Sequence, residues 1–448
     1  MLDDENEWNG SEADNGPGEE ESLLEKYRKM VQPMQDWEES SCFSVIPGAC
    51  PAAVDEELGE RIRLIEGVEV KEWELQAEAA EARAVLTYQE EEYEVSFSLV
   101  SIPPEALEDM VDTLPEEDQP WCRKETQALV IIMRFGKVPQ RSYHLQLKLA
   151  AVSVPDFVLL LDESAERFFS GRWVNMSAMS ALVPPVSSLY AITAVADEDQ
   201  SRVWLHTHGL CRCGLSELEV LDSNPDEYHN HAELVRGVAQ YMIDHIEEDL
   251  YEKPLFVGTL QGGKPIVATL IPWPTALTYY EGLTIGGPES REDSHNSLSS
   301  VIFLYRNQKA EDLGKFSKVS VYDGLWGDDP IYYVSQRETS RMSAVARERF
   351  DIAVGAFQQG KKMLVKVGLL ADEEHQNDDG DLREHIWFEM EELLPDGLFR
   401  ARLTQAPFWV GNMKIGDTGI YGLEQVTDWL VELEDYYVSP ENAYVLID

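Results

Sequence analysis

The stretch from Trp204 to Glu219, WLHTHGLCRCGLSELE, gathers histidine, cysteine, serine and glutamate side chains within a short length of chain. His206 and His208 lie two residues apart on an expected strand, so both imidazoles should project from the same face. Ser216 and Glu219 follow after a short turn. Imidazole nitrogens and carboxylate oxygens are ligands that Zn²⁺ accepts in proteins. The spacing therefore leads to the hypothesis of a zinc site.

The order of these four residues resembles the ligand spacing of JAMM-type zinc isopeptidases, in which His-x-His precedes a serine and an acidic ligand. The resemblance implies a zinc hydrolase in which His206, His208 and Glu219 bind the metal. The chain departs from that family by having glycine after the second histidine, where proline is usual, and glutamate in place of aspartate. An upstream acid would have to activate the zinc-bound water. Asp162 or Glu163, after the expected strand FVLLLD, is the candidate.

Three other interpretations of this stretch stay open. Cys211 and Cys213 could complete a structural zinc site, but their Cys-x-Cys spacing differs from the Cys-x₂₋₄-Cys of zinc fingers and ribbons. Glu217 and Glu219 could line a binding pocket together with the two histidines. We favour a structural role, in which the histidines form hydrogen bonds at the end of a strand and the cysteines fill the core. Under that interpretation no cofactor is expected, whereas the hydrolase alternative requires zinc.

Two weaker candidates lie in the last part of the chain. His385 and Trp387 share one face of an expected strand, and we favour core packing or a domain contact over catalysis for them. The acidic stretch Asp372–Asp381 has the composition of a calcium loop without its ligand spacing. We expect that stretch to be a solvated hairpin loop.

The net charge restricts the classes of partner. The 448-residue chain has 84 acidic and 36 basic side chains, which gives a formal net charge of −48. Such a field repels nucleic-acid phosphates and anionic lipids, so we expect neither a nucleic acid nor a membrane as partner. We expect much of this charge to be solvated surface and the remainder to favour a basic protein partner.

The compartment is predicted from features that the sequence lacks. It contains no window of about 20 apolar residues that could cross a membrane. The first residues are acidic and do not resemble a signal peptide, so we expect a cytoplasmic location. Five cysteines, an odd number in a chain of this length, do not indicate a disulfide framework.

The hydrophobic pattern predicts an α+β protein with mixed or antiparallel sheets, flanking helices and a small β-rich C-terminal domain. In YEVSFSLV, apolar and polar residues alternate as in a half-buried strand, and Gln89–Glu92 before it provides a hairpin turn. The pattern over Thr339–Gln358 predicts one long amphipathic helix. The expected parts are a disordered acidic tail (1–22), an α+β domain or domain pair (42–283), a loop or linker (284–300), a strand and the long helix (301–360), and the β-rich domain (361–448).

Two segments resemble known bacterial families. The segments EHIWFEM, LTQAPFWVGNMKIGD and VTDWLVEL resemble the YegJ-like domain, or domain of unknown function 2314, although Gln405 stands where that family tends to have asparagine. The residues that carry this similarity are Glu384, His385, Trp387, Pro407, Lys414, Gly416, Asp417, Asp428 and Trp429. The body, from about Cys42 to Gln359, is similar to domain of unknown function 4026 through WLHTHGLCRCGLSELEVLD and QRETSRMSAVA. These resemblances imply an architecture and a bacterial, cytoplasmic setting, but no reaction.

We therefore predict a non-enzymatic binding or regulatory protein with an acidic interaction surface, for example a toxin-neutralising or stress-related accessory protein. The alternative is the zinc hydrolase centred on His206, His208, Ser216 and Glu219. Convergence of the metal-binding side chains beside an open cleft would favour the enzyme. The sequence leaves the oligomeric state open.

Overall fold

The computed structural model describes residues 39–124, 126–260, 263–291, 298–326, 330–376, 382–434 and 436–447. The expected acidic tail lies outside these residues. The described chain forms two compact units. One contains Ile192–Met242 and Ile246–Tyr332, and the other contains Ser40–Ala191, Ile243–His245 and the residues from Tyr333 onward. No helix among the described residues is long and apolar enough to cross a membrane.

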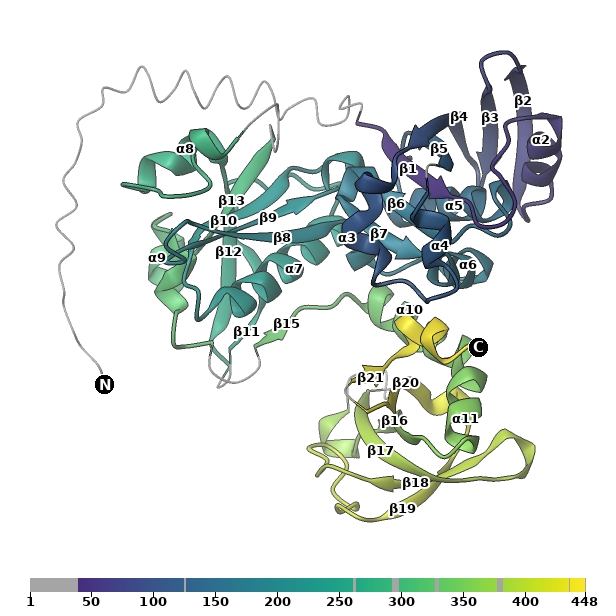
Figure 1. Ribbon diagram of the computed structural model, residues 1–448. Coiled ribbons are helices and arrows are strands. Elements are labelled where there is room, and N and C mark those ends of the chain that lie inside the picture. The colour runs from purple at the N-terminus through teal and green to yellow at the C-terminus, as the bar shows by residue number, and fades with distance from the viewer. Residues whose placement is uncertain are drawn as a thin grey trace. The chain divides into compact units, whose positions relative to one another are not determined.

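The unit that begins at Ser40 contains a seven-stranded antiparallel sheet in the order β2-β3-β4-β5-β1-β6-β7 (Figure 1). Its strands are β1 (Ser41–Ile46), β2 (Val68–Gln76), β3 (Glu81–Tyr88), β4 (Glu91–Ile102), β5 (Thr126–Met133), β6 (Leu159–Asp162) and β7 (Arg167–Ser170). Its longer helices are α2 (Glu56–Arg63), α5 (Pro139–Ser153) and α6 (Gly171–Met179), with the short α3 (Glu108–Val111) and α4 (Gln119–Cys122) between β4 and β5.

Helices α2 and α5 cover one face of this sheet, and α3 and α4 pack against part of the other face near β1, β5 and β6. Tyr143 of α5 packs edge-on against Phe43 of β1, with ring centroids 5.4 Å apart. The backbone of α2 approaches Trp73 of β2 at Gly59 so closely that a Cβ there would meet the indole at 2.9 Å. The predicted alternation in β4 is confirmed from Tyr93 to Phe97, because Tyr93, Val95 and Phe97 are buried and Glu94 is exposed, whereas Leu99 is half-buried. The predicted hairpin turn is confirmed at Gln89 and Glu90, both at positive φ, whereas Glu91 and Glu92, which the prediction also included, begin β4.

The same unit contains a six-stranded antiparallel sheet in the order β19-β18-β17-β16-β20-β21 (Figure 1). Its strands are β16 (Lys362–Leu370), β17 (Arg383–Leu393), β18 (Phe399–Leu403), β19 (Thr418–Tyr421), β20 (Val426–Glu432) and β21 (Tyr437–Val438). Helices α10 (Gln336–Glu348) and α11 (Phe350–Gln358) contribute to its core. The Trp429 indole N–H, for example, donates to the carbonyl oxygen of Ala346 at 3.0 Å.

The prediction of one helix over Thr339–Gln358 is wrong, because Arg349 separates α10 from α11. Arg349 has φ −102° and ψ 9°, outside the helical region. Its side chain is buried, and its guanidinium donates to the carbonyl oxygen of Pro440 at 2.7 Å. A tertiary hydrogen bond thus accompanies the break, and the sequence periodicity around Arg349 gave no sign of it.

The unit that contains Ile192–Met242 has an eight-stranded mixed sheet in the order β15-β11-β12-β13-β10-β9-β8, with β14 beside β13. Its strands are β8 (Ala191–Ala196), β9 (Val203–His208), β10 (Glu217–Ser223), β11 (Leu255–Thr259), β12 (Pro265–Pro272), β13 (Ser299–Leu304), β14 (Ser317–Lys318) and β15 (Ile331–Tyr332), and the short α8 (Trp273–Ala276) and α9 (Gln308–Asp312) flank them. Helix α7 (Tyr228–Asp244) follows β10, and β10 pairs with β13 in parallel. The mixed and antiparallel sheets with flanking helices confirm the predicted α+β class.

Candidate functional site

The sixteen-residue stretch of ligand-type residues forms the β9–β10 hairpin. The two strands are antiparallel, with His206 directly opposite Glu219. Every residue of β9 is buried. The Trp204 and His206 rings stack at 3.9 Å, and His208 meets His206 edge-on at 4.8 Å. Both histidines therefore share one face as predicted, but as part of a buried column of rings.

Glu219 belongs to a buried ion pair. Its carboxylate accepts from the Trp204 indole N–H at 2.9 Å and from the Arg291 guanidinium. Arg291 also lies over the Trp273 ring, 3.8 Å from its centroid. The Glu219 side chain is 0% exposed and that of Arg291 is 10% exposed. Burial raises the pKa of Glu219, although the charge and hydrogen bonds of Arg291 oppose the shift. Both carboxylate oxygens thus have partners within the unit.

Glu217 closes the turn between the two strands. One carboxylate oxygen accepts from the backbone N–H groups of Gly209 at 2.9 Å and Cys211 at 3.0 Å, and the other accepts from the Thr207 hydroxyl at 2.5 Å. Burial raises the pKa of Glu217, and these hydrogen bonds act in the opposite direction. The carboxylate satisfies buried donors of the turn, which is a structural use of the residue.

The remaining candidates of this stretch also have structural contacts. The Ser216 hydroxyl donates to the Ser300 hydroxyl at 3.0 Å, and its backbone N–H donates to the Tyr251 hydroxyl at 3.1 Å. Cys211 and Cys213 are buried free thiols, and burial raises the pKa of Cys211.

The described residues contain no group of three or more His, Cys, Asp or Glu side chains placed to hold a metal ion. Of the two candidate bases, Glu163 is exposed, and Asp162 is buried with its carboxylate accepting from the Tyr143 hydroxyl at 3.2 Å. The zinc-hydrolase hypothesis therefore stays a prediction without geometric support.

His385 and Trp387 lie on the face of β17 opposite the core. Ile386 and Phe388 are fully buried, whereas His385 is exposed and Trp387 is half-buried. Of the two roles that we favoured, core packing is therefore wrong for His385, and a domain contact stays a prediction. The His385 Nδ1 lies 3.0 Å from the Thr427 hydroxyl, and the Lys366 ammonium lies 5.0 Å from the Trp387 ring centroid. Burial, with nearby Lys366 and Arg383, lowers the pKa of His385. Part of the expected calcium-like loop, residues 377–381, lies outside the described residues.

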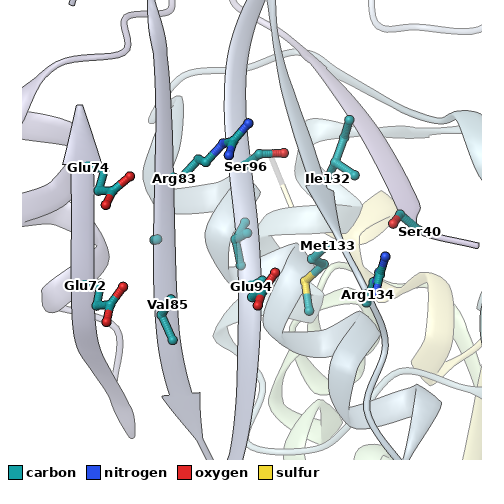
Figure 2. Close-up of a pocket in the computed structure, with 12 residues that line it drawn as sticks. Ser40, Glu72, Glu74, Arg83, Val85, Glu94, Ser96, Ile132, Met133 and Arg134 are labelled. Carbon is teal, nitrogen blue, oxygen red and sulfur yellow. The ribbon is translucent and has the colours of Figure 1, made fainter. Parts of the chain in front are cut away.

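A second group of carboxylates, which the search for motifs missed, lies over β2, β3 and β4 on the face of the seven-stranded sheet opposite α2 and α5. We call Glu72, Glu74 and Glu94, with the hollow between them, the acidic face. Two rows of paired residues cross β2, β3 and β4, namely Glu74, Arg83 and Ser96, and Glu72, Val85 and Glu94. Figure 2 shows these side chains around the hollow, which has a volume of about 380 Å³.

The acidic face differs from the hairpin in its lack of internal partners. Glu72, Glu74 and Glu94 are all exposed, and none of them forms a hydrogen bond or ion pair with any residue that the structure describes. Alternate strands of a sheet are about 10 Å apart, so Glu72 and Glu94 flank a strip one strand wide with Val85 at its centre. The arrangement can receive cationic groups on both sides of an apolar contact.

Family comparisons match two consecutive parts of the chain. The N-terminal part of a protein family of unknown function, DUF4026, matches residues 41–185, and its C-terminal part matches residues 192–303. Together the two matches cover more than half of the chain. The chain belongs to the DUF4026 family. No curated protein and no solved structure matches it.

The DUF4026 match includes both groups of carboxylates. The two family parts meet between residues 185 and 192, close to the division between the compact units at Ala191 and Ile192. The N-terminal part therefore contains the acidic face and the C-terminal part contains the hairpin. The sequence did contain a signal for the acidic face, since VEVKEWELQ and EEYEVSFSLV both place glutamates on the polar side of a strand. Only the pairing register shows that those glutamates meet around one hollow.

Proposed function

We propose that this DUF4026 protein is a non-enzymatic binding protein that captures a basic protein partner on its acidic face. The observation that carries the proposal is the set of three exposed carboxylates around the hollow, Glu72, Glu74 and Glu94, without partners among the described residues. Carboxylates on a surface are normally solvated singly, but here the pairing register gathers Glu72 and Glu74 of β2 and Glu94 of β4 on the two sides of β3. The net charge of −48 adds a long-range field that attracts cationic partners.

The lining of the hollow favours an extended segment of alternating character. Alternate side chains of an extended segment point to the same side, so lysine or arginine side chains two residues apart would reach Glu72 and Glu94, and their aliphatic stems would cover Val85. Ile132, which is 37% exposed, extends the apolar contact toward β5. Arg83 and Arg134 also line the hollow, so the partner has to place its cations beside the glutamates and away from these two arginines.

A direct binding measurement tests the proposal. The probe is an end-capped peptide of sequence KVKVK, titrated into the full chain by calorimetry at low and at physiological salt, with EVEVE as the reversed-charge control. We expect KVKVK to bind, EVEVE not to bind, and the affinity to fall as salt screens the exposed charges. The triple variant Glu72→Gln, Glu74→Gln and Glu94→Gln should weaken binding at least tenfold.

A matched variant distinguishes the effect of the acidic face on binding from the effect of the overall net charge. Glu105, Glu108 and Glu116 are exposed glutamates of the same unit outside the hollow. Changing these three to Gln removes the same net charge and should leave KVKVK binding within about twofold, because screening confines charge effects to roughly 10 Å at 0.1 M salt. Equal losses in both triple variants, or no binding of KVKVK, would overturn the proposal.

We also propose that the six-stranded sheet and its loops form a YegJ-like domain. The support comes from the contacts of its motif residues. The buried Glu384 carboxylate accepts from the backbone N–H groups of Phe408 and Trp409, each at 2.7 Å, and Asp417 accepts from that of Lys414 at 2.8 Å. A solved YegJ-like structure whose corresponding glutamate does not bind two successive amides would contradict this assignment.

For the compartment, we propose the cytoplasm of a bacterium. All five cysteines, Cys42, Cys50, Cys122, Cys211 and Cys213, are free thiols. Free thiols are the usual state in a reducing compartment. Fractionation of the native host, followed by detection of the chain in a compartment other than the cytoplasm, would contradict this location.

A further inference from the structure

The two edges of the seven-stranded sheet differ in how they are protected. The β2 edge carries charged residues such as Glu69 and Lys71, and its pairing with β3 shifts register between Val70 and Glu72. Charges and bulges are the usual devices that prevent another strand from pairing with an edge. The β7 edge, with the sequence RFFS, is short and has neither a proline nor a shift in register; the guanidinium of its one charged residue, Arg167, is bound to the carbonyl oxygens of Ser187 and Tyr190.

The backbone of β7 is available on its outer side. Among the residues that the structure describes, β7 pairs only with β6 and is the last strand of the sheet. Within the described residues, no backbone hydrogen bond joins Phe168 or Phe169 to a segment other than β6. In an antiparallel ladder alternate residues direct their N–H and C=O groups away from the paired strand. The outer side of β7 therefore presents a short row of donors and acceptors at backbone spacing.

A cleft of about 480 Å³ lies against this edge. Its apolar lining includes Phe168, which is 38% exposed, and Phe169, which stacks on Trp173 at 4.2 Å. Hydroxyl groups such as those of Ser187 and Ser188 supply the polar lining.

The charged groups of the cleft already have partners. The Arg167 guanidinium donates to the carbonyl oxygens of Ser187 at 2.9 Å and Tyr190 at 3.0 Å. The Glu441 carboxylate accepts from the Arg341 guanidinium at 2.7 Å. A ligand of this cleft therefore needs no compensating charge, in contrast with a ligand of the acidic face.

We infer that the cleft binds an extended, uncharged peptide segment of another protein, which adds to the β7 edge as an extra strand. The unpaired backbone edge selects a polypeptide, because only a peptide backbone repeats donors and acceptors at the spacing of a strand. The exposed Phe168 ring selects an aromatic or aliphatic side chain opposite it. Arg167 and Glu441 each already have a partner within the chain, so the cleft favours an uncharged segment.

The test uses the full chain and a fluorescein-labelled, end-capped peptide of sequence TVFVT, with binding measured by fluorescence anisotropy. Two control peptides carry methyl groups on one or the other alternate set of backbone nitrogens. We expect one methylated set to abolish binding and the other to be tolerated, because only one side of an added strand faces β7. Equal binding of both methylated peptides, or no binding of TVFVT itself, would overturn the inference.

Variants locate the site. Phe168→Lys should weaken TVFVT binding at least tenfold, whereas Glu69→Lys on the opposite edge should leave it unchanged. If Phe168→Lys does not fold, hydrogen exchange of the wild-type chain decides, because the peptide should slow exchange of the β7 amides; no slowing there would overturn the inference. The triple glutamine variant of the acidic face should bind TVFVT normally at every salt concentration, so this inference and the proposed function can fail independently.

Discussion

The β9–β10 hairpin and the acidic face both place two glutamates two residues apart on one strand, Glu217 and Glu219 on β10 and Glu72 and Glu74 on β2, yet they use them in opposite ways. In the hairpin, Glu217 and Glu219 are buried and every carboxylate oxygen has a donor from the same unit. On the acidic face, three exposed carboxylates have no partner among the described residues. The comparison teaches that a dense group of ligand-type residues is not evidence of a binding site. Burial and internal partners decide whether a carboxylate is available.

The largest effect should come from breaking the buried ion pair. Glu219→Ala leaves Arg291 without its buried partner, and we expect the free energy of unfolding to fall by about 3–5 kcal/mol. Urea denaturation followed by circular dichroism measures this change. The triple glutamine variant of the acidic face is the comparison, and it should change stability by no more than about 0.5 kcal/mol because its side chains are exposed. Similar losses in the two proteins would remove the distinction between the two groups.

A smaller, pH-dependent effect is expected at Glu217. Burial raises its pKa above the ordinary value of 4.5, so in that pH range the folded state holds the proton more tightly than the unfolded chain does. This contribution to stability is complete below pH 4.5 and is lost as pH rises through the raised pKa. Glu217→Gln removes it, so the stability advantage of the wild type over the variant should shrink as pH increases. Urea midpoints at several pH values from 4.5 upward provide the measurement, and an advantage that grows with pH would contradict the argument.

The smallest effect is expected at His385. Its ring is exposed and its only described hydrogen-bonding neighbour is Thr427. His385→Ala should change the free energy of unfolding by no more than about 0.5 kcal/mol, as for most surface substitutions. Thermal denaturation measures the change, with Phe388→Ala as a buried control on the same strand that should cost about 3–5 kcal/mol. A large loss at His385 would mean that this face supports the domain more than its exposure suggests.

Local sequence patterns predicted helices and strands, whereas contacts between residues far apart in the sequence determine which of their side chains are available for binding. Alternation predicted β4 correctly, and residue type marked Gln89–Glu92 as a turn, because both signals act over a few residues. The shared face of His206 and His208 was likewise a local prediction. The sequence could not show that Arg291, in a segment expected to be only a loop, would form an ion pair with the Glu219 carboxylate. It could not show the helix break at Arg349 either, where a partner 91 residues away is involved.

The ion pair of Glu219 also has a consequence for the order of folding. His206 and Glu219 are close in the chain, so their hairpin could form early by local collisions. Arg291, however, lies 72 positions after Glu219, and closing so long a loop is slower than closing a hairpin. Until Arg291 arrives, a buried ionised Glu219 would be an uncompensated charge. A hairpin that is local in sequence must therefore wait for a distant residue before it can become part of the core.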